Sequence, residues 1–461
     1  MTQGPKGGVL HKRGDSGYEA ARLNAVWNAR KPDRFPDAIL LARTDEDVVS
    51  GVQWARENGL KVSLRSGGHS FVGNGVRNGG LLIDLHQLEG DIEVNPDAAT
   101  VTVRPATAGP AIDSALAPHG LFFPTGHAPT VGVGGFSLGG GYGWNSRTFG
   151  PACLSIKSID AVLANGTFVH ADDTNHPELL WAARGSGPGF FAAVTSFEMA
   201  VHPRHEEIRR TTHAYPIELR DEVLGWSYDL LPSLPSQVEL SAKVGYTPAV
   251  GQPAVNVTAT AFCTEASGLD LLAPLETAPF RERALRAQVN VPTSMTELYA
   301  AADSLTPPGF RWSLDGIWCE GDVAEILRKA RPIFDGIPSD LCFVLWMLWG
   351  HYPERSDACW STQATLYLSP NAGWSAAAAD LQHELWAHQA LADMGSISRG
   401  LQFSDNNLAD RPDKGLSDEN AARLEEIRTR YDPEHLFRTY MQTEESTTAL
   451  GRSRIRKPDH G

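Results

Sequence analysis

The sequence has few cysteines, no long hydrophobic run and a shortage of positive charge. Its 461 residues include 5 cysteines, and no two of them form a CxxC pair. This pattern argues against a disulfide framework and a structural zinc site, so we expect no bound metal. No apolar run approaches the roughly 20 residues of a membrane span, and the N-terminus lacks the apolar centre of a secretory signal. We therefore expect a cytoplasmic protein that binds no membrane.

The charge balance is acidic, with 55 acidic residues against 40 Lys and Arg and a net charge of −15. Because phosphate backbones are bound by clustered Lys and Arg, we expect no nucleic-acid partner. Glycine, by contrast, is concentrated: 44 are present, and the densest runs are short. Such clusters place backbone close to a ligand or at positive φ.

The glycine-rich texture ends near residue 205, and this change divides the chain. We expect a first domain over residues 1–205, with its core at about 33–205. Residues 206–410 alternate strand patterns with helical ones, which predicts a second domain with a mixed sheet and helices on one face. Residues 411–461 form a C-terminal segment with one helix over 418–430. The whole chain is predicted to be an α+β protein.

Three glycine-dense loops, at 65–70, 132–143 and 185–189, need an explanation. A Rossmann phosphate loop requires GxGxxG, and the run that begins at Gly132 lacks the third glycine. Glycines can also simply fill tight turns, but three such loops within 200 residues make this explanation weak. The remaining interpretation is that consecutive backbone N–H groups bind a diphosphate held between the loops 65–70 and 132–143.

His69 and Cys153 lie in or beside these loops. An isolated loop histidine is usually structural, and an isolated cysteine usually belongs to the core. Gly67 and Gly68, however, leave room for a planar ligand to reach the His69 imidazole. Cys153 follows a proline turn, where N–H dipoles and nearby Arg147 are expected to lower its pKa and favour the nucleophilic thiolate.

Several ordered motifs together resemble one family. They are Arg65–Ser70, Val131–Gly135, Gly139–Gly143, His176–Ala182, Arg184–Gly187, Val194–Thr195 and Tyr431–Phe437. With these motifs the chain resembles the FAD-linked oxidases of the berberine-bridge-enzyme-like group, in the vanillyl-alcohol-oxidase (PCMH-type FAD-binding) superfamily. The resemblance covers about residues 8–205 and 417–442.

The resemblance implies a PCMH-type FAD-binding domain of two α/β subdomains, a substrate domain with an antiparallel sheet, and a C-terminal segment that returns to the FAD domain. It also implies a doubly attached FAD, with His69 bonded to the flavin 8α-methyl and Cys153 bonded to C6. The other residues expected to contact FAD are Arg65, Ser66, Gly67, Gly68, Ser70, Thr130, Val131, Gly132, Val133, Gly134, Gly135, Ser137, Gly140, Gly141, Tyr142, Gly143, Val194 and Tyr440.

The catalytic base is not given by the resemblance. Many relatives carry Tyr-x-Asn near the end of the substrate domain, whereas Gly400, Leu401 and Gln402 occupy that place here. Candidate replacements are Tyr142, Tyr367, Gln402 and Tyr440. A tyrosine would need a cationic neighbour to act as a base near neutral pH, because its usual pKa is near 10.

Strand alternation indicates which residues could face a substrate. The candidate polar faces are Gln363, Thr365 and Tyr367 on one strand and Asn256, Thr258 and Thr260 on another; candidate stacking residues are Trp312, Trp318, Trp346 and Trp349.

The expected activity is hydride abstraction from a C–OH or C–N of a sugar, alcohol or secondary metabolite, with molecular oxygen as the electron acceptor. A dehydrogenase, an oxidative cyclase and a non-catalytic small-molecule-binding flavoprotein remain alternatives.

Overall fold

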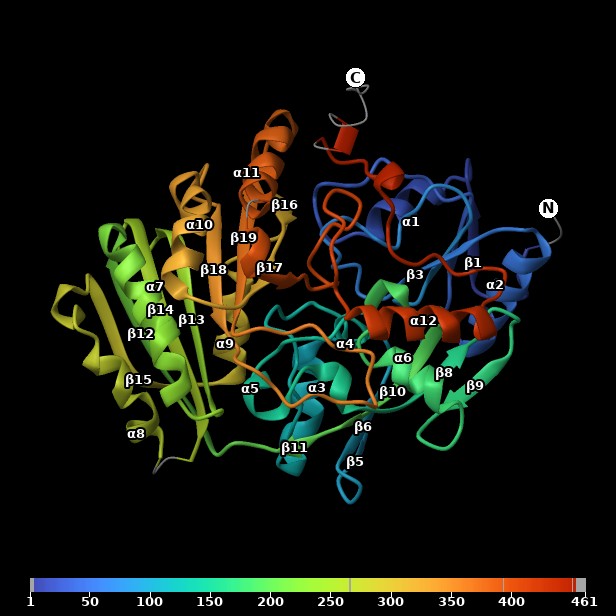
Figure 1. Ribbon diagram of the computed structural model, residues 1–461. Coiled ribbons are helices and arrows are strands. Elements are labelled where there is room, and N and C mark those ends of the chain that lie inside the picture. Colours follow the sequence, from blue (N-terminus) through green and yellow to red (C-terminus); the bar gives the residue numbers. More distant parts are fainter. Residues whose placement is uncertain (1–3, 265–266, 393, 450, 453–461) are drawn as a thin grey trace.

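The computed structural model describes residues 4–264, 267–392, 394–449 and 451–452. One large sheet with its helices lies on the left of Figure 1, and two smaller sheets lie on the right. The first small sheet has the order β1-β2-β4-β3, in which β2, β3 and β4 run parallel. Its elements are β1 (Val9–Lys12), α1 (Tyr18–Asn24), β2 (Ala38–Leu41), α2 (Asp45–Glu57), β3 (Val62–Arg65) and β4 (Leu81–Asp84).

Helix α2 illustrates how the sequence determines these elements. Thr44 accepts a hydrogen bond from the backbone N–H of Asp47, and the Asp47 carboxylate accepts one from the Thr44 backbone, which completes the predicted capping box. Gly59, just beyond the helix, has φ +65°, a conformation that glycine adopts without strain. The buried face of α2 then packs on the parallel strands.

The second small sheet is antiparallel, with the order β5-β6-β10-β8-β9. Its strands are β5 (Glu93–Asn95), β6 (Thr100–Val103), β8 (Ile156–Val162), β9 (Phe168–Ala171) and β10 (Ala193–Ala200), and β7 (Leu121–Phe122) pairs with β11 (His202–Pro203). The predicted hairpin at Asn165-Gly166 joins β8 to β9. Helices α3 (Gly109–Leu116), α4 (Val133–Leu138), α5 (Ser146–Phe149) and α6 (Pro177–Ala183) surround this sheet.

The large sheet has the order β15-β12-β14-β13-β18-β19-β17-β20, with β16 also paired to β19. Its strands are β12 (Glu207–Pro216), β13 (Val238–Thr247), β14 (Gln252–Cys263), β15 (Arg286–Thr293), β16 (Arg311–Leu314), β17 (Ile317–Cys319), β18 (Phe343–Leu348), β19 (Leu366–Trp374) and β20 (Ser398–Gly400). Helices α7 (Arg220–Leu230), α10 (Val323–Asp335) and α11 (Asp380–Ala392) cover one face, as the sequence predicted. The remaining helices of this region are α8 (Gly268–Leu272) and α9 (Met295–Asp303).

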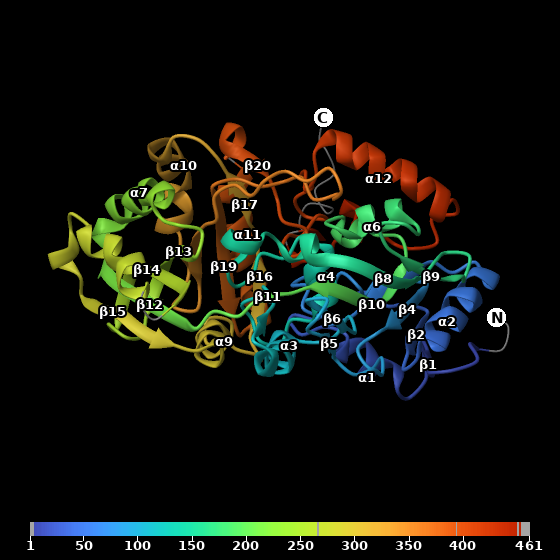
Figure 2. The same cartoon turned by 90° about the horizontal axis from the view of Figure 1, so that it is seen from below.

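The C-terminal segment returns to the first small sheet. Helix α12 (Asp418–Tyr431) packs beside α6, as Figures 1 and 2 both show. The backbone N–H of Val62 on β3 donates to the Leu436 carbonyl at 2.8 Å, and the N–H of Arg438 donates to the Val62 carbonyl at 2.7 Å. Residues that are about 370 positions apart are thereby joined.

Two strands near the cavity have unusual limits. Asp315 and Gly316 interrupt the stretch 310–319 and leave the two short strands β16 and β17. Strand β19 runs through Pro370 to Trp374. This proline pairs with Val344 in the ladder and still does not end the strand. The tertiary pairing overrides the local signal.

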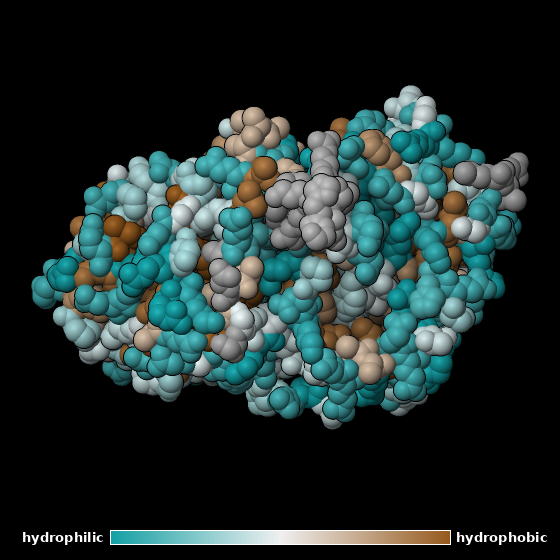
Figure 3. Space-filling view, turned by 45° about the horizontal axis from the view of Figure 1, so that its top comes forward, coloured by the Kyte–Doolittle hydropathy of each residue, from teal (hydrophilic) through white to brown (hydrophobic). Residues whose placement is uncertain are grey.

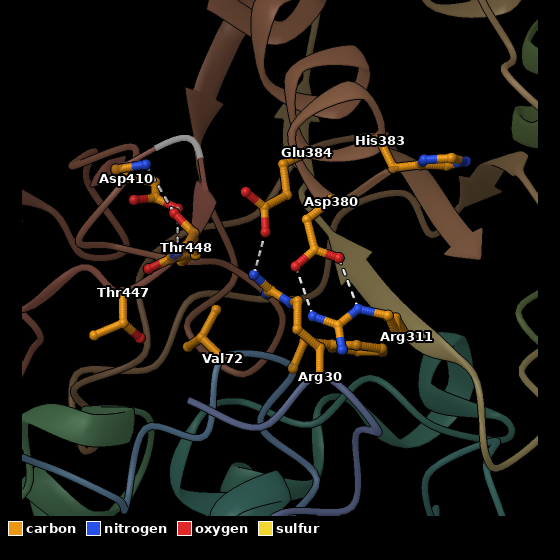
Figure 4. Close-up of polar contacts among 12 residues, drawn as sticks. Arg30, Val72, Arg311, Asp380, His383, Glu384, Asp410, Thr447 and Thr448 are labelled. Atoms are coloured by element: carbon orange, nitrogen blue, oxygen red, sulfur yellow. Dashed lines mark hydrogen bonds and ion pairs between the residues drawn. The ribbon is translucent and has the colours of Figure 1, made fainter. Parts of the chain in front are cut away.

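The loop that follows α1 fastens the two halves of the molecule together. Asn28 donates its amide N–H to the Trp312 carbonyl and accepts from the Trp312 N–H, at 2.8 and 3.0 Å. Arg30 forms a buried ion pair with Glu384 on α11. Figure 4 shows this pair beside the Arg311–Asp380 pair, where the loop meets the large-sheet helices.

Arg30→Met is expected to lower the free energy of unfolding by about 3 kcal/mol, because it removes the positive partner of a buried ion pair and keeps the carboxylate buried. The Arg30 and Glu384 side chains are only 9% and 3% exposed. Arg43→Met is the matched control, since Arg43 and Glu89 are 61% and 58% exposed. The control should cost at most about 1 kcal/mol. Urea unfolding measures both, and equal losses would contradict a fastening role for Arg30.

The surface agrees with the acidic, charged composition. The face seen in Figure 3 is covered mainly by hydrophilic residues, with hydrophobic residues in separate patches. Within the described ranges, no helix combines the length and apolar character needed to cross a bilayer.

Candidate functional site

A cavity of about 460 Å³ lies between the large sheet and the glycine loops of the small-sheet region. The loops 65–70 and 130–135 line it on one side, and β18 and β19 line it on the other. Most of the residues that the sequence nominated meet here. Those that line the cavity are Arg65, Ser66, Gly67, Gly68, His69, Ser70, Thr130, Val131, Gly132, Gly134, Gly135, Tyr142, Val194, Tyr367 and Gln402.

The two loops approach each other through glycine. A Cβ placed on Gly67 would lie 2.7 Å from the backbone nitrogen of Gly132, so no larger residue fits without moving the loop. Gly68 has φ +76°, which an L-residue rarely adopts. Arg65, at the start of this loop, pairs with Asp84 at 2.9 Å, and its Nε is buried without a partner among the described residues. The loops thus present backbone to the cavity, and Arg65 lines it while its own Nε is buried beneath Gly68.

His69 is held in a fixed orientation at the cavity wall. Its ring stacks on Trp27, with centroids 5.1 Å apart and planes 25° apart. Burial and the nearby Arg65 lower the pKa of His69 to about 4, while a hydrogen bond to the Thr130 backbone opposes this shift. The imidazole is therefore neutral at physiological pH. A neutral ring retains one nitrogen lone pair that can bond to carbon.

Cys153 differs from the prediction in its electrostatics. Its side chain is fully buried, in a cluster with Ala358 and Trp360 against which Tyr142 packs. Burial raises the pKa of the Cys153 thiol instead of lowering it. Arg147 does not stabilise a thiolate here, because its guanidinium donates to the Val238 and Trp349 carbonyls. The predicted activation by Arg147 is therefore wrong.

The second half of the long glycine loop serves packing more than ligand contact. The Cys153 N–H donates to the Gly140 carbonyl and the Ala152 N–H donates to the Gly141 carbonyl, both at 2.8 Å. A Cβ on Gly143 would collide with the Thr125 carbonyl. Among the described residues, several nominated cofactor contacts do not border the cavity: Val133, Ser137, Gly140, Gly141, Gly143, Cys153 and Tyr440.

Two of the nominated tyrosines lie in different surroundings. Tyr142 lines the cavity, and its ring lies against Trp318 and Trp349, with centroids 4.7 and 5.3 Å away. Burial raises its pKa well above the usual value. Tyr440 instead donates its hydroxyl to the Ser186 carbonyl at 2.7 Å and stacks on Phe403. That hydrogen bond and stacking fit a structural role for Tyr440.

Tyr367, on β19, has a partner that the sequence did not indicate. Its hydroxyl donates to the Asp405 carboxylate at 3.0 Å, and both residues line the cavity. Burial raises the pKa of Asp405 to about 6. No motif points to Asp405, because it lies in an irregular loop after β20 and meets Tyr367 only through the fold. His127 was also overlooked; it lines the cavity, and burial lowers its pKa to about 4.

The sheet wall of the cavity is divided into an apolar and a polar strip. The apolar strip consists of alternate residues of β18 and its end, namely Phe343, Leu345, Met347 and Trp349, and the polar strip on β19 consists of Tyr367, Ser369 and Asn371. These strips are neighbours, because Met347 pairs with Tyr367 and Leu345 pairs with Ser369.

The other nominated surface residues are engaged elsewhere. Gln363 bonds to the Tyr352 backbone, and Thr365 bonds to Glu320. The Asn256 amide donates a hydrogen bond to Thr247, and the Thr258 hydroxyl is hydrogen-bonded to that of Thr212. Among the described residues, the cavity lining does not include Asn256, Thr258 or Thr260. Of the nominated tryptophans, Trp349 faces the cavity, whereas Trp312, Trp318 and Trp346 are buried in the core.

Comparison with known proteins identifies relatives along nearly the whole chain. Residues 36–172 match the family described as the FAD binding domain. The chain is 30% identical over 430 residues to the FAD-linked oxidoreductase janO of Penicillium janthinellum, which covers 92% of this chain and 94% of the relative. The fold is similar to 6-hydroxy-D-nicotine oxidase from Arthrobacter nicotinovorans, with a TM-score of 0.82, 23% identity and coverage of 94% and 97%. The structure of Physcomitrella patens BBE-like 1 is also similar, with a TM-score of 0.77 and 20% identity. The match covers 96% of this chain and 97% of that one.

Proposed function

Because the chain belongs to the FAD-linked oxidoreductases, we propose that it is an oxidase with covalently bound FAD that oxidises a small molecule at a C–OH or C–N group. One observation carries this proposal: the loops 65–70 and 130–135 meet at a cavity into which His69 is held. The family assignment makes the protein an FAD-dependent oxidoreductase, and the proposal adds the attachment, the substrate chemistry and the role of oxygen.

The residues at this cavity fit FAD. The crowded crossing at Gly67 and Gly132 leaves backbone exposed where a diphosphate would be bound by N–H groups. Arg65 lines the same side of the cavity and adds positive charge there. Val194 and Phe197 offer an apolar surface farther along the same cavity. Bound FAD would supply the hydride acceptor, and its reduced form would pass the electrons to molecular oxygen.

His69 is the proposed attachment to the flavin 8α position. Its stacking on Trp27 and its hydrogen bond to Thr130 fix the ring, and its lowered pKa keeps it neutral and nucleophilic. Cys153 is the proposed second attachment, at flavin C6. Tyr142 packs against the Cys153 cluster and lines the cavity, so this second bond requires the Tyr142 ring to shift.

The proposed substrate is a largely apolar small molecule that carries one oxidisable polar group. The β18 strip offers Leu345, Met347 and Trp349 to an apolar body, and the β19 strip offers two hydroxyls and an amide to a single polar group. Trp27, Phe71 and Leu305 add further apolar surface to the lining. A sugar would place hydroxyl groups against the β18 strip, whose lining residues are apolar or aromatic.

The proposal is tested by mixing the FAD-loaded protein, without oxygen, with a panel of hydroxylated or aminated aromatic and terpenoid compounds. Sugars form the comparison set. Bleaching of the flavin absorbance band by a compound of the first set, followed by recovery on exposure to oxygen, is the expected result. Bleaching without rapid recovery would indicate a dehydrogenase, and a product that has lost two hydrogens with ring closure would indicate a cyclase. Tight binding without bleaching across the panel would indicate a binding protein and contradict the proposal.

A further inference from the structure

The Tyr367–Asp405 pair combines features expected of proton-transfer groups. Tyr367 projects from the polar strip of β19, and Asp405 projects from the loop that follows β20. The 3.0 Å hydrogen bond between Tyr367 Oη and Asp405 Oδ2 joins them across the edge of the cavity. Both groups line the space beside Tyr142 and Gln402, two residues that were also considered as bases.

Tyr367, the hydrogen-bond partner of Asp405, lies in an apolar setting. The Tyr367 ring packs against Trp318, with centroids 5.0 Å apart, and the local cluster includes Ala364 and Trp349. Among the described residues, the Asp405 carboxylate accepts a hydrogen bond from Tyr367 and forms no ion pair with a basic side chain. Asp405 is partly exposed at the cavity. A carboxyl group that lines a cavity and has a raised pKa is a candidate for proton transfer.

We propose that Tyr367 and Asp405 form a proton relay for the oxidation, in which the Tyr367 hydroxyl contacts the substrate and Asp405 is the final proton acceptor. This inference rests on the proposed oxidase function, and it supplies the base that Gly400 cannot provide. It also removes the need for a cation beside tyrosine, because Tyr367 can transfer its own proton to Asp405 as it receives one and need not ionise.

The step is balanced for an alcohol substrate. The substrate O–H proton moves to Tyr367 Oη while the Tyr367 proton moves to Asp405 Oδ2. The electron pair of the broken O–H bond would form the new C=O bond. The hydrogen of the adjacent C–H would leave with its electron pair as hydride, for which FAD would supply the acceptor. The substrate thereby loses two hydrogens and two electrons, Tyr367 is unchanged, and Asp405 is protonated until it releases the proton to solvent.

The pH dependence follows from the acceptor. Asp405 accepts a proton only when it is ionised, and burial raises its pKa to about 6. The rate of flavin reduction should therefore rise with pH through about 6 and level off above it. The charged groups that approach Tyr367 are Asp315 and Arg411, and these pair with each other at 2.6 Å. His388 contacts Asp315 from α11, and Tyr142 faces the same cluster, with its pKa raised by burial.

His127 is the competing acceptor in this cavity. Its ring lies against Trp144, with centroids 4.2 Å apart, and Arg210 helps burial to lower its pKa to about 4. A base with so low a pKa accepts a proton less readily than one near 6, because proton transfer is most effective when the pKa lies near the working pH. Its variant is therefore included in the test.

The relay is tested by stopped-flow measurement of the rate of flavin reduction. The FAD-loaded protein is mixed with a substrate found in the panel, at pH values from 5 to 9. Asp405→Asn and Tyr367→Phe are each expected to slow reduction by about 10²–10⁴-fold. Asp405→Asn should also abolish the rise near pH 6, whereas Tyr228→Phe and Asp335→Asn, which lie on other faces, should leave rate and profile unchanged. An unaltered profile in Asp405→Asn, or its loss in His127→Gln, would overturn the proposal.

A second readout does not depend on turnover. Infrared difference spectra of the FAD-loaded protein, recorded as the pH is lowered, should show the carbonyl band of a protonated buried carboxyl group near pH 6 in the wild type. The band should be absent in Asp405→Asn and shifted in Tyr367→Phe, in which the hydrogen bond is lost. Absence of the band from the wild type would overturn the relay. Failure of every compound to reduce the wild type would instead contradict the oxidase function, whatever the infrared result.

Discussion

The His69→Ala variant is expected to hold its flavin at a midpoint potential lower by about 30 mV or more than that of the wild type. An electron-withdrawing attachment makes the flavin a stronger oxidant, and for a two-electron couple about 30 mV corresponds to about 1.4 kcal/mol, or tenfold in equilibrium constant. Flavin reduction should slow accordingly. Spectroelectrochemical titration of the two proteins measures the difference directly.

The single variants separate the two proposed attachments. His69→Ala and Cys153→Ala should each retain flavin after denaturation through the remaining bond, and the double variant should release it completely. His86→Ala, at an exposed histidine, and Cys263→Ala, at a buried cysteine on β14, are the matched controls and should behave as the wild type does. If Cys153→Ala does not alter the potential and His69→Ala alone releases all flavin, only the histidine attachment exists.

Gly67→Ala is expected to abolish most FAD loading. The added methyl group would lie 2.7 Å from the Gly132 nitrogen and 3.2 Å from its Cα, and both of these atoms belong to backbone. The loops must therefore separate, which removes the aligned N–H groups proposed to bind the diphosphate. The flavin-to-protein absorbance ratio of the purified variant gives the loading.

Gly225→Ala is the control for this substitution. Gly225 lies within α7, and its Cβ would meet only Leu327, at 3.7 Å. Alanine is favoured over glycine in a helix by about 1 kcal/mol, so this variant should load FAD normally and lose no stability. Normal loading in Gly67→Ala would contradict the role assigned to the crossing of the loops.

The sequence was most informative where function requires particular local backbone. The loops at 65–70 and 130–135 could be recognised because glycine is needed where Gly67 and Gly132 approach each other. The capping box at Thr44 and Asp47 could be recognised for the same reason, since each contact spans only a few residues.

Contacts between distant segments could not be predicted in this way. Asp405 meets Tyr367 across 38 positions, and Arg30 meets Glu384 across 354 positions, and neither pair has a local signal. The pKa of Cys153 was mispredicted because the neighbours in sequence suggested Arg147, whereas the fold buries the thiol and directs Arg147 to carbonyl groups. The carbonyls of Gly140 and Gly141 accept hydrogen bonds from the backbone at Cys153 and Ala152, contacts that only the fold reveals.

The most direct test of covalent flavin attachment is the intact mass of the wild-type protein under denaturing conditions, followed by peptide mapping. The account predicts the mass of the chain plus one FAD, with the flavin located on the peptide that contains His69 and joined to the peptide that contains Cys153. A chain that carries the bare mass, with all flavin free in solution, would contradict it.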